Sequence, residues 1–394
     1  MIPRFSYSFS LRKAWRAVTD LGKEPTSSEE QYNSLFPGST VYEFSSARQG
    51  LTICLSALQL GKNARVGVQP YTCSSVLVAI EAAGCRPVFI DINSQLTLDS
   101  HDLAQKINTL DALLVTHTFG IAADIDAIKK IVGRLPVIED CAHAFLCKLN
   151  GQYLGTQFDL AVFSFGNGKF PAMGSGGLLV VNTPTYKQAV SRAMGQLKKN
   201  PFVGELTYIV RQLAYSVIFS RIGYQIRYRF IEPYTKERGR SITKLPVATY
   251  GMATTVKQRI RREWAELVIA SARQRQLAVA SMNVPTTRLE WLYNPDVDSN
   301  CFTLACLTDE RDQLYTFLVK RGIGAGKHFQ QAQLWATAFG YEAGSCPAFE
   351  RILPQILTLP CHYTLTTRDA ARIEQALIDY EQISIATARK IDSL

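Results

Sequence analysis

The stretch FSFGNGKFPAMGSGG, residues 163–177, places a lysine between glycines. We expect a strand to end at Ser164-Phe165, a loop to present Lys169, and a glycine-rich turn to follow. Glycine permits the positive φ angles of tight turns, so such a loop can direct its lysine into a cleft. A lysine whose pKa is lowered by burial can form a Schiff base with an aldehyde. The alternative is a solvated loop lysine.

The stretch VIEDCAHAF, residues 137–145, places an acid and an imidazole after another expected strand. Asp140 ends that strand, and His143 follows three residues later. A short helix starting here would put both side chains on one face. An aspartate at this edge can keep a pyridine nitrogen protonated, which makes the ring an electron sink. The alternative is a capping aspartate beside a packed histidine.

The stretch FSSARQGLTICLSAL, residues 44–58, reads as a small polar turn that opens an amphipathic helix. Free N–H groups and the helix dipole bind phosphate at a helix N-terminus, and Arg48 could add a charge-assisted contact. The alternative is an ordinary capped helix. Together the three stretches predict a site with three parts: a cradle that binds a phosphate group, an acid that pairs with a ring nitrogen, and a lysine amine that reacts with an aldehyde.

The elements that must position these residues follow one another regularly from Val41 to about Thr183. Short apolar runs alternate with amphipathic stretches, which indicates βαβ units and a mainly parallel sheet. We expect strands at 65–70, 86–92, 112–117, 135–140, 160–165 and 177–182, and helices at 74–83, 99–109 and 123–133. Polar residues follow the carboxyl ends of several strands, where the active sites of such sheets lie.

Outside this series we expect an irregular N-terminal arm and a second α/β unit. In the second unit, strands are expected at 298–308 and 353–362, and helices at 310–322 and 366–383. The expected domains are therefore the arm (1–40), a large domain (41–245) and a small C-terminal domain (246–394).

The composition is that of a globular protein, with 47% hydrophobic and 19% charged residues in 394. No apolar run reaches the roughly 18 residues of a spanning helix, and the first residues lack the apolar core of a secretory signal. The nine cysteines include no CxxC pair, which argues against a zinc site or a disulfide framework. We therefore expect a reduced, cytoplasmic protein.

The net charge is +10, and residues 194–244 contain ten Lys/Arg against three Asp/Glu. Part of this segment, 205–234, is also aromatic and apolar, and we expect it to be helical. It could be a dimer-interface or core helix pair with a charged rim. It could instead lie on an acidic membrane surface, which would place the protein at the inner membrane, or form a cationic wall for a nucleotide diphosphate. No motif supports binding of nucleic acid.

The chain resembles the DegT/DnrJ/EryC1/StrS family of pyridoxal-phosphate sugar aminotransferases. The similarity spans about 40–185 and 295–385, and the stretches that match are SARQGL, GCRPVFIDI, HTFGIAADIDAI, VIEDCAHAF, FSFGNGKFPAMGSGG, RDQLYTFLVKRGIGAGKHF and ILTLPCHYTLTTRD. The resemblance implies the α/β fold type I, with a mainly parallel sheet of the seven-stranded type and a smaller C-terminal α/β domain. It also implies the cofactor pyridoxal 5'-phosphate, no metal, and a homodimer with its active site at the interface.

The resemblance also assigns roles to residues. Lys169 would form the Schiff base with the cofactor, and Asp140 would pair with its pyridine nitrogen. His143 would lie beside the cofactor, and His328 near the sugar. The cofactor phosphate would be contacted by Ser46, Ala47, Arg48 and Ser164.

The chain departs from the family pattern in four places, one of which is Ser175, where the family often has an acidic residue. Arg48 stands where the usual Ser-Gly-Thr cradle has a hydroxyl. The aromatic residue expected to stack on the ring falls at Cys73, so stacking would come from Tyr71 or be lost. The Asn-Tyr-Arg block that reaches into the partner's site is not recognisable, and residues 190–250 replace it.

These features predict an aminotransferase that moves an amino group from an amino acid, expected to be glutamate, to a keto-sugar carried on a nucleotide. Lys169 argues against the sugar dehydratases of the family, in which histidine replaces this lysine. One alternative is transfer to another small ketone, such as a cyclitol precursor. Another is a regulatory or scaffold protein that binds the cofactor without turning over.

Overall fold

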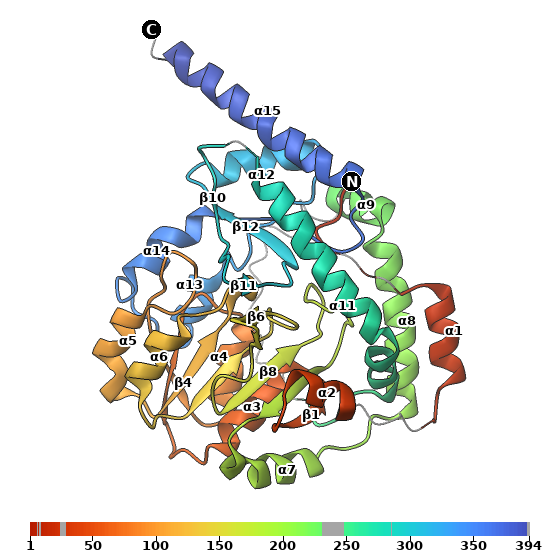
Figure 1. The fold of residues 1–394 in the computed structure, drawn as a ribbon, viewed down its shortest axis with the longest axis vertical. Coiled ribbons are helices and arrows are strands. Elements are labelled where there is room, and N and C mark those ends of the chain that lie inside the picture. Colours follow the sequence, from red (N-terminus) through yellow and green to blue (C-terminus); the bar gives the residue numbers. More distant parts are fainter. Residues whose placement is uncertain (6, 8, 24–28, 231–247, 285, 392–394) are drawn as a thin grey trace.

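A seven-stranded sheet forms the centre of the molecule (Figure 1). The computed structural model describes residues 1–394 except 6, 8, 24–28, 231–247, 285 and 392–394. The strands lie in the order β1-β9-β8-β5-β4-β2-β3. Their bounds are Thr40–Phe44 (β1), Arg65–Val68 (β2), Arg86–Phe89 (β3), Ala112–Thr116 (β4), Val137–Asp140 (β5), Leu160–Ser164 (β8) and Gly177–Val181 (β9). The pairs from β8 to β3 are parallel and β9 is antiparallel to both neighbours, so the expected mainly parallel sheet is confirmed.

Helices connect the parallel strands. Their bounds are Ala47–Ala57 (α3), Ser74–Ala82 (α4), Ser100–Lys106 (α5) with the 3-10 turn Ile107–Thr109 (η1), Thr118–Gly120 (η2) and Ile125–Val132 (α6). In α6, Ile125, Ile128 and Val132 are buried, and this i, i+3, i+7 spacing forms one apolar stripe. The strands and helices expected between 65 and 182 are confirmed, with ends shifted by at most three residues.

The expectation of an irregular N-terminal arm is wrong. The first 40 residues contain α1 (Leu11–Thr19) and α2 (Glu29–Leu35), and β1 starts at Thr40. The buried residues of α1 are Ala14 and Ala17. Leu11, Ala14, Trp15 and Val18 follow the i, i+3, i+4, i+7 spacing of an amphipathic helix, so the sequence does contain a helical signal here.

Residues 184–230 form η3 (Pro184–Tyr186), α7 (Lys187–Gly195), α8 (Phe202–Ile218) and α9 (Arg221–Phe230). The helical prediction for 205–234 is therefore confirmed up to residue 230, with a break between α8 and α9, and residues 231–234 lie outside the described residues. Helix α8 packs beside α1 and continues into α9 (Figure 1).

The C-terminal part contains a three-stranded antiparallel sheet in the order β10-β12-β13. Its strands are Glu290–Trp291 (β10), Thr303–Leu307 (β12) and Ile356–Pro360 (β13). Its helices are Thr254–Met282 (α11), Arg311–Lys320 (α12), Ala332–Thr337 (α13), Pro347–Ile352 (α14) with the turn Leu353–Gln355 (η4), and Thr367–Ile391 (α15). The strand expected at 298–308 is interrupted, because β11 (Val297–Asp298) instead pairs with β6 (Lys148–Leu149), which pairs with β7 (Gln152–Tyr153).

Two hydrophobic clusters hold these parts together. One surrounds the seven-stranded sheet and includes residues of α13 and α14. The other surrounds the three-stranded sheet and includes Ile2. The domain boundary expected at residue 246 stays a prediction. Among the described residues, no helix combines the length and apolar character needed to cross a membrane.

Candidate active site

A cavity of about 230 Å³ opens at the carboxyl ends of the parallel strands. The two parallel strands that follow β2 in the chain lie on opposite sides of it, β3 on one side and β4 on the other. The direction in which successive strands are added to the sheet therefore reverses beside β2. Ligands of open α/β sheets bind at such a switch point, because the loops after the two neighbouring strands leave in opposite directions. Eight predicted site residues line the cavity: Ser46, Ala47, Arg48, Cys73, Asp140, His143, Ser164 and Lys169.

Lys169 and His143 are in direct contact in this cavity. The Lys169 Nζ atom lies 2.5 Å from His143 Nε2. The other ring nitrogen, Nδ1, accepts a hydrogen bond from the backbone N–H of Phe119 at 3.1 Å. A neutral imidazole has one N–H group, so with Nδ1 as an acceptor the proton is on Nε2. His143 therefore donates to the lone pair of an uncharged Lys169 amine.

Burial favours the same protonation states. Burial lowers the pKa of Lys169 from its ordinary value, and the neighbouring Cys73 and Asp140 only partly offset this. Burial also lowers the pKa of His143 well below its ordinary value, and Lys169 adds to the effect. Lys169 is thus no solvated loop residue. The lowered pKa brings the uncharged, nucleophilic form of its amine within easier reach.

Asp140 ends β5 and is 4% exposed. Its Oδ1 accepts the backbone N–H of Ala142 at 3.0 Å. Burial raises the pKa of this carboxyl, while the Ala142 N–H and Lys169 act against the rise. Ser164 ends the neighbouring strand β8, and its Oγ accepts the N–H of Gly166 at 3.4 Å. Both residues lie at the sheet edge that faces the cavity.

The short helix expected after Asp140 does not form, and residues 141–147 make two turns instead. Asn300 supplies the physical reason. Its buried amide donates to the carbonyl oxygens of His143 and Phe145, at 3.1 and 2.9 Å. Tertiary contacts thereby use carbonyls that a helix would use in its own bonds. The position of His143 thus depends on a residue far away in the sequence.

Two helix N-termini meet at the cavity. Ser46 is the N-cap of α3, where its Oγ accepts the N–H of Gln49 at 3.4 Å. Cys73 is the N-cap of α4 and makes no side-chain capping bond. Arg48 links the two helices, because its guanidinium donates to the Oγ of Ser75 at 3.2 Å. Unpaired N–H groups and two helix dipoles make this wall suited to an anion.

The loop that presents Lys169 is shaped by glycines. Gly168 has a φ of +71°, and a Cβ there would lie 3.2 Å from the ring of Phe5. Gly176 has a φ of +93°, and its N–H donates to the carbonyl of Ser45 at 2.8 Å. The lysine loop is therefore bonded to the start of α3 and covered by the N-terminal arm.

Two predicted site residues, Tyr71 and His328, do not line the cavity. The Tyr71 ring packs edge-on against Phe119 and Phe329, with centroids 6.3 and 5.5 Å apart. Its hydroxyl donates to the carbonyl oxygen of His328 at 3.2 Å. The Nδ1 atom of His328 accepts from the Arg4 guanidinium at 2.8 Å. The Tyr71 ring therefore packs against Phe329, which itself lines the cavity, and the His328 ring lies 5.7 Å from the ring of His143.

Other residues of the wall were not selected from the sequence. Phe329 supplies an aromatic ring, inclined by 23° to that of His143 at a centroid distance of 6.1 Å. Thr116 lies beside Asp140 in the register of β4 and β5. Its buried Oγ1 has no hydrogen-bond partner within the described part of the chain. A polar residue at the end of an expected strand was the signal that could have identified Thr116.

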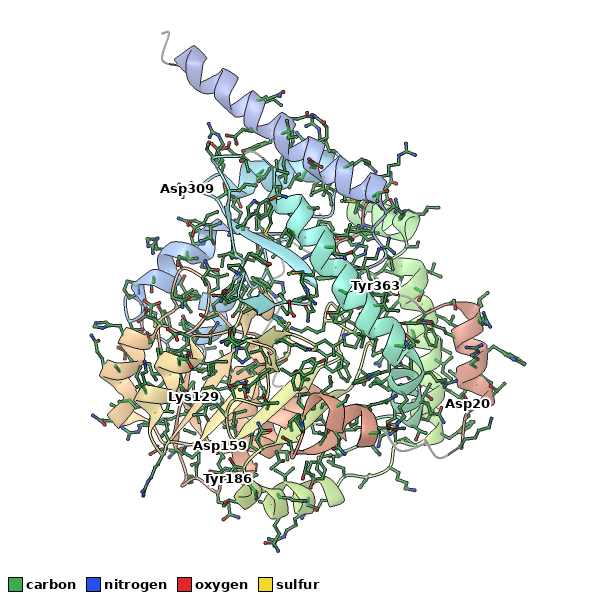
Figure 2. All side chains as sticks on the ribbon, viewed as in Figure 1. Asp20, Lys129, Asp159, Tyr186, Asp309 and Tyr363 are labelled. Carbon is green, nitrogen blue, oxygen red and sulfur yellow. The ribbon has the colours of Figure 1, made fainter. Side chains whose placement is uncertain are left out.

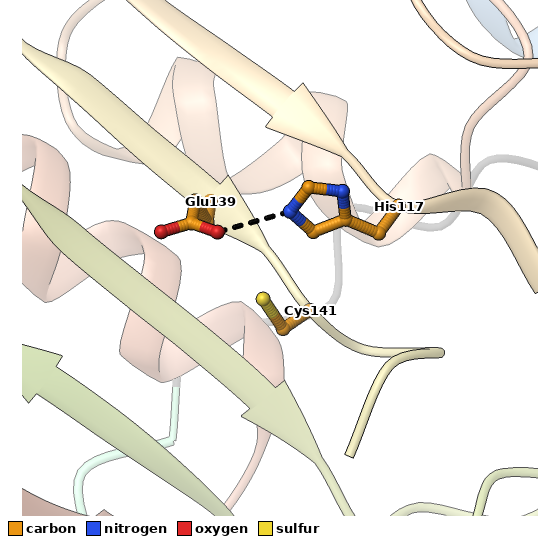
Figure 3. Close-up of side chains that lie close together, drawn as sticks. All are labelled: His117, Glu139 and Cys141. Atoms are coloured by element: carbon orange, nitrogen blue, oxygen red, sulfur yellow. Dashed lines mark hydrogen bonds and ion pairs between the residues drawn. The ribbon is translucent and has the colours of Figure 1, made fainter. Parts of the chain in front are cut away.

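His117, Glu139 and Cys141 lie close together around the carboxyl ends of β4 and β5, as Figure 3 shows. His117 Nε2 donates to Glu139 at 3.0 Å, and its Nδ1 accepts the N–H of Ala123 at 3.1 Å. The carboxylate of Glu139 also accepts three backbone N–H groups, those of Gly155, Gln157 and Phe158. Burial raises the pKa of the Cys141 thiol well above its ordinary value, and the carboxylates of Glu139 and Asp140 add to this. The nitrogen and oxygen atoms that could bind a metal already take part in hydrogen bonds, and the Cys141 thiol keeps its proton. We therefore interpret this cluster as a structural hydrogen-bond network rather than a metal site.

Residues 11–227 and 258–378 match the model of the DegT/DnrJ/EryC1/StrS aminotransferase family. The chain belongs to this family. The resemblance drawn from the sequence stretches is thus confirmed. The unmatched residues 228–257 fall within the 190–250 region, where the Asn-Tyr-Arg block is not recognisable.

Two curated relatives and one solved structure show the extent of the similarity. GDP-perosamine synthase of Escherichia coli O157:H7 is 33% identical over 150 residues, which are 37% of this chain and 41% of that protein. The dTDP-3-amino-3,4,6-trideoxy-alpha-D-glucose transaminase of Micromonospora megalomicea subsp. nigra is 31% identical over 145 residues, 36% of this chain and 39% of that protein. The chain therefore matches less than half the length of either relative.

The sugar aminotransferase CalS13 from Micromonospora echinospora has the same fold. Its crystal structure superimposes with a TM-score of 0.73, at 20% identity, over 96% of this chain and 99% of that chain. The α/β fold class expected from the sequence is thus confirmed.

Proposed function

We propose that this chain is a pyridoxal-phosphate-dependent aminotransferase that moves an amino group from an amino acid, with glutamate as the expected donor, to a nucleotide-linked keto-sugar. The observation that supports this most strongly is an uncharged lysine amine in one cavity with a buried carboxylate and two helix N-termini. Family membership supports amino transfer. The names of the two curated relatives support a sugar linked to GDP or dTDP.

The residues present fit pyridoxal 5'-phosphate. The N-termini of α3 and α4 would bind its phosphate, with Arg48 adding positive charge. Asp140 would hold the ring nitrogen. The buried Oγ1 of Thr116, which has no partner among the described residues, would gain one from a polar ring substituent. His143 and Phe329 line the cavity as rings on which a flat cofactor could stack.

When bound, the cofactor would supply an aldehyde for amine exchange and a ring that accepts electrons. Lys169 would hold the cofactor through Nζ. Once the donor amine has displaced it, the same Nζ would take the proton from the substrate carbon and return it. His143 would orient Nζ and keep it uncharged through its Nε2–H. Asp140 would keep the ring nitrogen protonated.

The donor half-reaction tests this proposal. Holoenzyme reduced with borohydride and digested should have its cofactor bonded to Lys169, and addition of glutamate before reduction should prevent this labelling. Lys169→Ala should show no labelling, and Asp140→Asn should keep its label but lose most of its turnover. Labelling of another lysine would contradict the role of Lys169. Labelling of Lys169 without a half-reaction with any amino acid would favour the regulatory or scaffold alternative.

The acceptor is tested with the amine-loaded enzyme and a panel of GDP- and dTDP-linked keto-sugars, with a keto-cyclitol as comparison. His328 remains our candidate for contact with the acceptor. Its Nδ1 accepts from Arg4, so its proton is on Nε2, which is buried without a partner in the described part of the chain. Faster reaction with the keto-cyclitol than with any nucleotide sugar would overturn the proposed acceptor.

We further propose a homodimer in a reducing, cytoplasmic compartment. The family resemblance supports the dimer. The nine cysteines are all free, and all except Cys73 are buried, which supports a reducing compartment. Light scattering of the holoenzyme should give twice the 43.9 kDa mass of one chain. A mass of one chain at micromolar concentration would contradict the dimer.

A further inference from the structure

One side of the molecule exposes a row of large apolar side chains. On α1, Leu11 and Trp15 are 79% and 69% exposed. On α8, every seventh residue is an exposed valine, and on α9 two isoleucines are exposed. We call this surface the α1–α8–α9 face, and its apolar residues are Leu11, Trp15, Val18, Val203, Val210, Val217, Ile222 and Ile226.

Helical spacing places these side chains on the outside of one layer. In α1 the exposed residues recur at i, i+4 and i+7, and the buried Ala14 and Ala17 lie along one flank of this stripe. In α8 the inner side has Tyr208 and Gln212, both buried, and Tyr208 donates to the carbonyl of Met173 at 3.0 Å. Figure 1 shows α1 beside α8 at one edge of the molecule, with α9 beyond α8. The helices that bear the exposed apolar residues are therefore neighbours on one side of the molecule.

The exposed charges on α1 and α8 are positive. They are Arg12, Arg16 and Arg211. Residues 1–19 contain no Asp or Glu. The one acid of α8, Glu205, is buried and accepts from the backbone N–H groups of Thr254 and Thr255 at 2.8 and 3.0 Å.

The acidic groups nearest to α1 are already paired with cations. Asp20, at the end of α1 in Figure 2, forms an ion pair with Arg262 at 2.5 Å. Glu263 and Glu266 of α11 both pair with Lys13, at 3.0 and 3.5 Å, and Glu263 also pairs with Arg259 at 2.9 Å. These pairs leave the arginines of α1 and α8 to set the sign of the potential at the α1–α8–α9 face.

The distribution of charge decides which partner fits. A symmetric dimer through this face would bring two positively charged patches together, which is unfavourable. An anionic bilayer instead offers phosphates to the arginines and an apolar layer at the depth that exposed valines and a tryptophan reach. We propose that the α1–α8–α9 face docks the protein on the surface of an anionic membrane. This inference does not depend on the proposed aminotransferase activity.

Vesicle flotation tests the proposal. The holoenzyme should float with vesicles of phosphatidylcholine and phosphatidylglycerol, should not float with phosphatidylcholine alone, and should be released by high salt. The triple variant Arg12→Glu/Arg16→Glu/Arg211→Glu should bind the anionic vesicles at least about tenfold more weakly, since each cation near such a surface contributes to binding. Trp15→Ser/Val210→Ser/Val217→Ser should weaken binding even in low salt, because the apolar contact is lost.

Matched substitutions on the opposite side of the molecule serve as controls. Leu334→Ser on α13 and Arg351→Glu on α14 change an exposed leucine and an exposed arginine, and both should float like the unchanged protein. Thermal melting confirms that each variant is folded. Absence of flotation with anionic vesicles, or equal flotation of all variants, would overturn the proposal. Dissociation of a dimer by the Trp15, Val210 and Val217 substitutions, without any change in flotation, would identify a second copy as the occupant.

Discussion

At the scale of single residues, the chemistry of the cavity depends on which ring nitrogen of His143 carries the proton. The donor that decides this is the backbone N–H of Phe119. Phe119 has a φ of +57°, which is uncommon for a bulky side chain. Strain of this kind persists where surrounding contacts hold it, and it is frequent at functional sites. Here the strained residue donates the bond that sets the tautomer of His143 and, through it, the uncharged state of Lys169.

The contact between His143 and Lys169 predicts a pH dependence. Because the pKa of Lys169 is lowered in the folded protein, its amine stays uncharged to a lower pH than an ordinary lysine, and cofactor uptake should slow as the pH falls through this lowered pKa. His143→Glu would place a carboxylate beside the amine and raise its pKa, so the midpoint of uptake against pH should move upward by about one unit or more. The measurement is the rate of absorbance change when pyridoxal phosphate is added to apo-protein.

His143→Gln is the matched control for that experiment. Its amide oxygen can accept from the Phe119 N–H while its NH₂ donates to Lys169, as the imidazole does. The pH profile should therefore stay close to that of the unchanged protein. Identical profiles for the Glu and Gln variants would show that His143 does not set the protonation of the amine.

Thr116 gives a prediction in which stability and binding change in opposite directions. Thr116→Val replaces a buried hydroxyl without a partner in the described chain by a methyl of similar shape. Free energy of unfolding of the apo-protein should stay equal or rise by about 1 kcal/mol, because no unsatisfied hydroxyl remains. Cofactor affinity should fall by about fivefold to tenfold, because a hydrogen bond is lost. Urea unfolding and cofactor titration measure the two effects, and unchanged affinity would argue against contact between Thr116 and the cofactor.

At the scale of elements, strand ends and helix starts bring the chemistry together. Strand β5 lies between β4 and β8 and is parallel to both. The carboxyl ends of the three strands therefore bring Thr116, Asp140 and Ser164 to one edge of the sheet. Helices α3 and α4 pack on each other, and their N-termini reach that edge. The loop after β8 then only has to return across the edge to bring Lys169 into place, and glycine makes this sharp return possible.

Gly168 therefore gives a prediction at this scale. Gly168→Ala adds a Cβ at a φ of +71°, close to the Phe5 ring, and should lower the free energy of unfolding by about 1–2 kcal/mol. It should also weaken cofactor binding, because the loop with Lys169 must shift. Gly61→Ala is the control, since Gly61 has no positive φ and no atom near the added Cβ, and it should be neutral or slightly stabilising. Equal stability of the two variants in urea would contradict this account of the loop.

At the scale of the whole molecule, the N-terminal residues connect the C-terminal sheet to the cavity. Ile2 donates its N–H to Gly322 at 2.7 Å and accepts the N–H of Gly324 at 2.9 Å. Its side chain is fully buried in the core of the C-terminal part. Three residues later, Phe5 covers Gly168 beside the catalytic lysine proposed here. The first residues of the chain thus support the position of the loop with Lys169.

Removing the anchor of these residues should affect the whole molecule. Ile2→Ala leaves a cavity in the C-terminal core and should lower the free energy of unfolding by about 3 kcal/mol. Leu11→Ala, nine residues later at an exposed site, should change it by less than about 0.5 kcal/mol. Urea denaturation of both variants measures the difference. A similar loss for both would mean that the N-terminal residues are not anchored through Ile2.

The sequence by itself determined the parallel sheet and most of the polar residues at its edge. Apolar runs such as 112–115 and 160–163 form buried strands because every side chain in them favours burial on both faces. The order of strands along the chain then predicts that Asp140 and Lys169 lie at the same edge. These conclusions need only local pattern and chain direction.

Only the tertiary structure decided how those residues are oriented. The turn at His143 is fixed by Asn300. The ring of Tyr71 packs against Phe119 and Phe329 and does not line the cavity. That the buried hydroxyl of Thr116 has no partner among the described residues depends on the neighbours that the fold places around it. In helix α1 the fold buries the two alanines and leaves the larger apolar residues Leu11, Trp15 and Val18 exposed, which helical spacing alone does not predict. Each of these features depends on contacts between residues far apart in the chain, and a local pattern contains no information about such contacts.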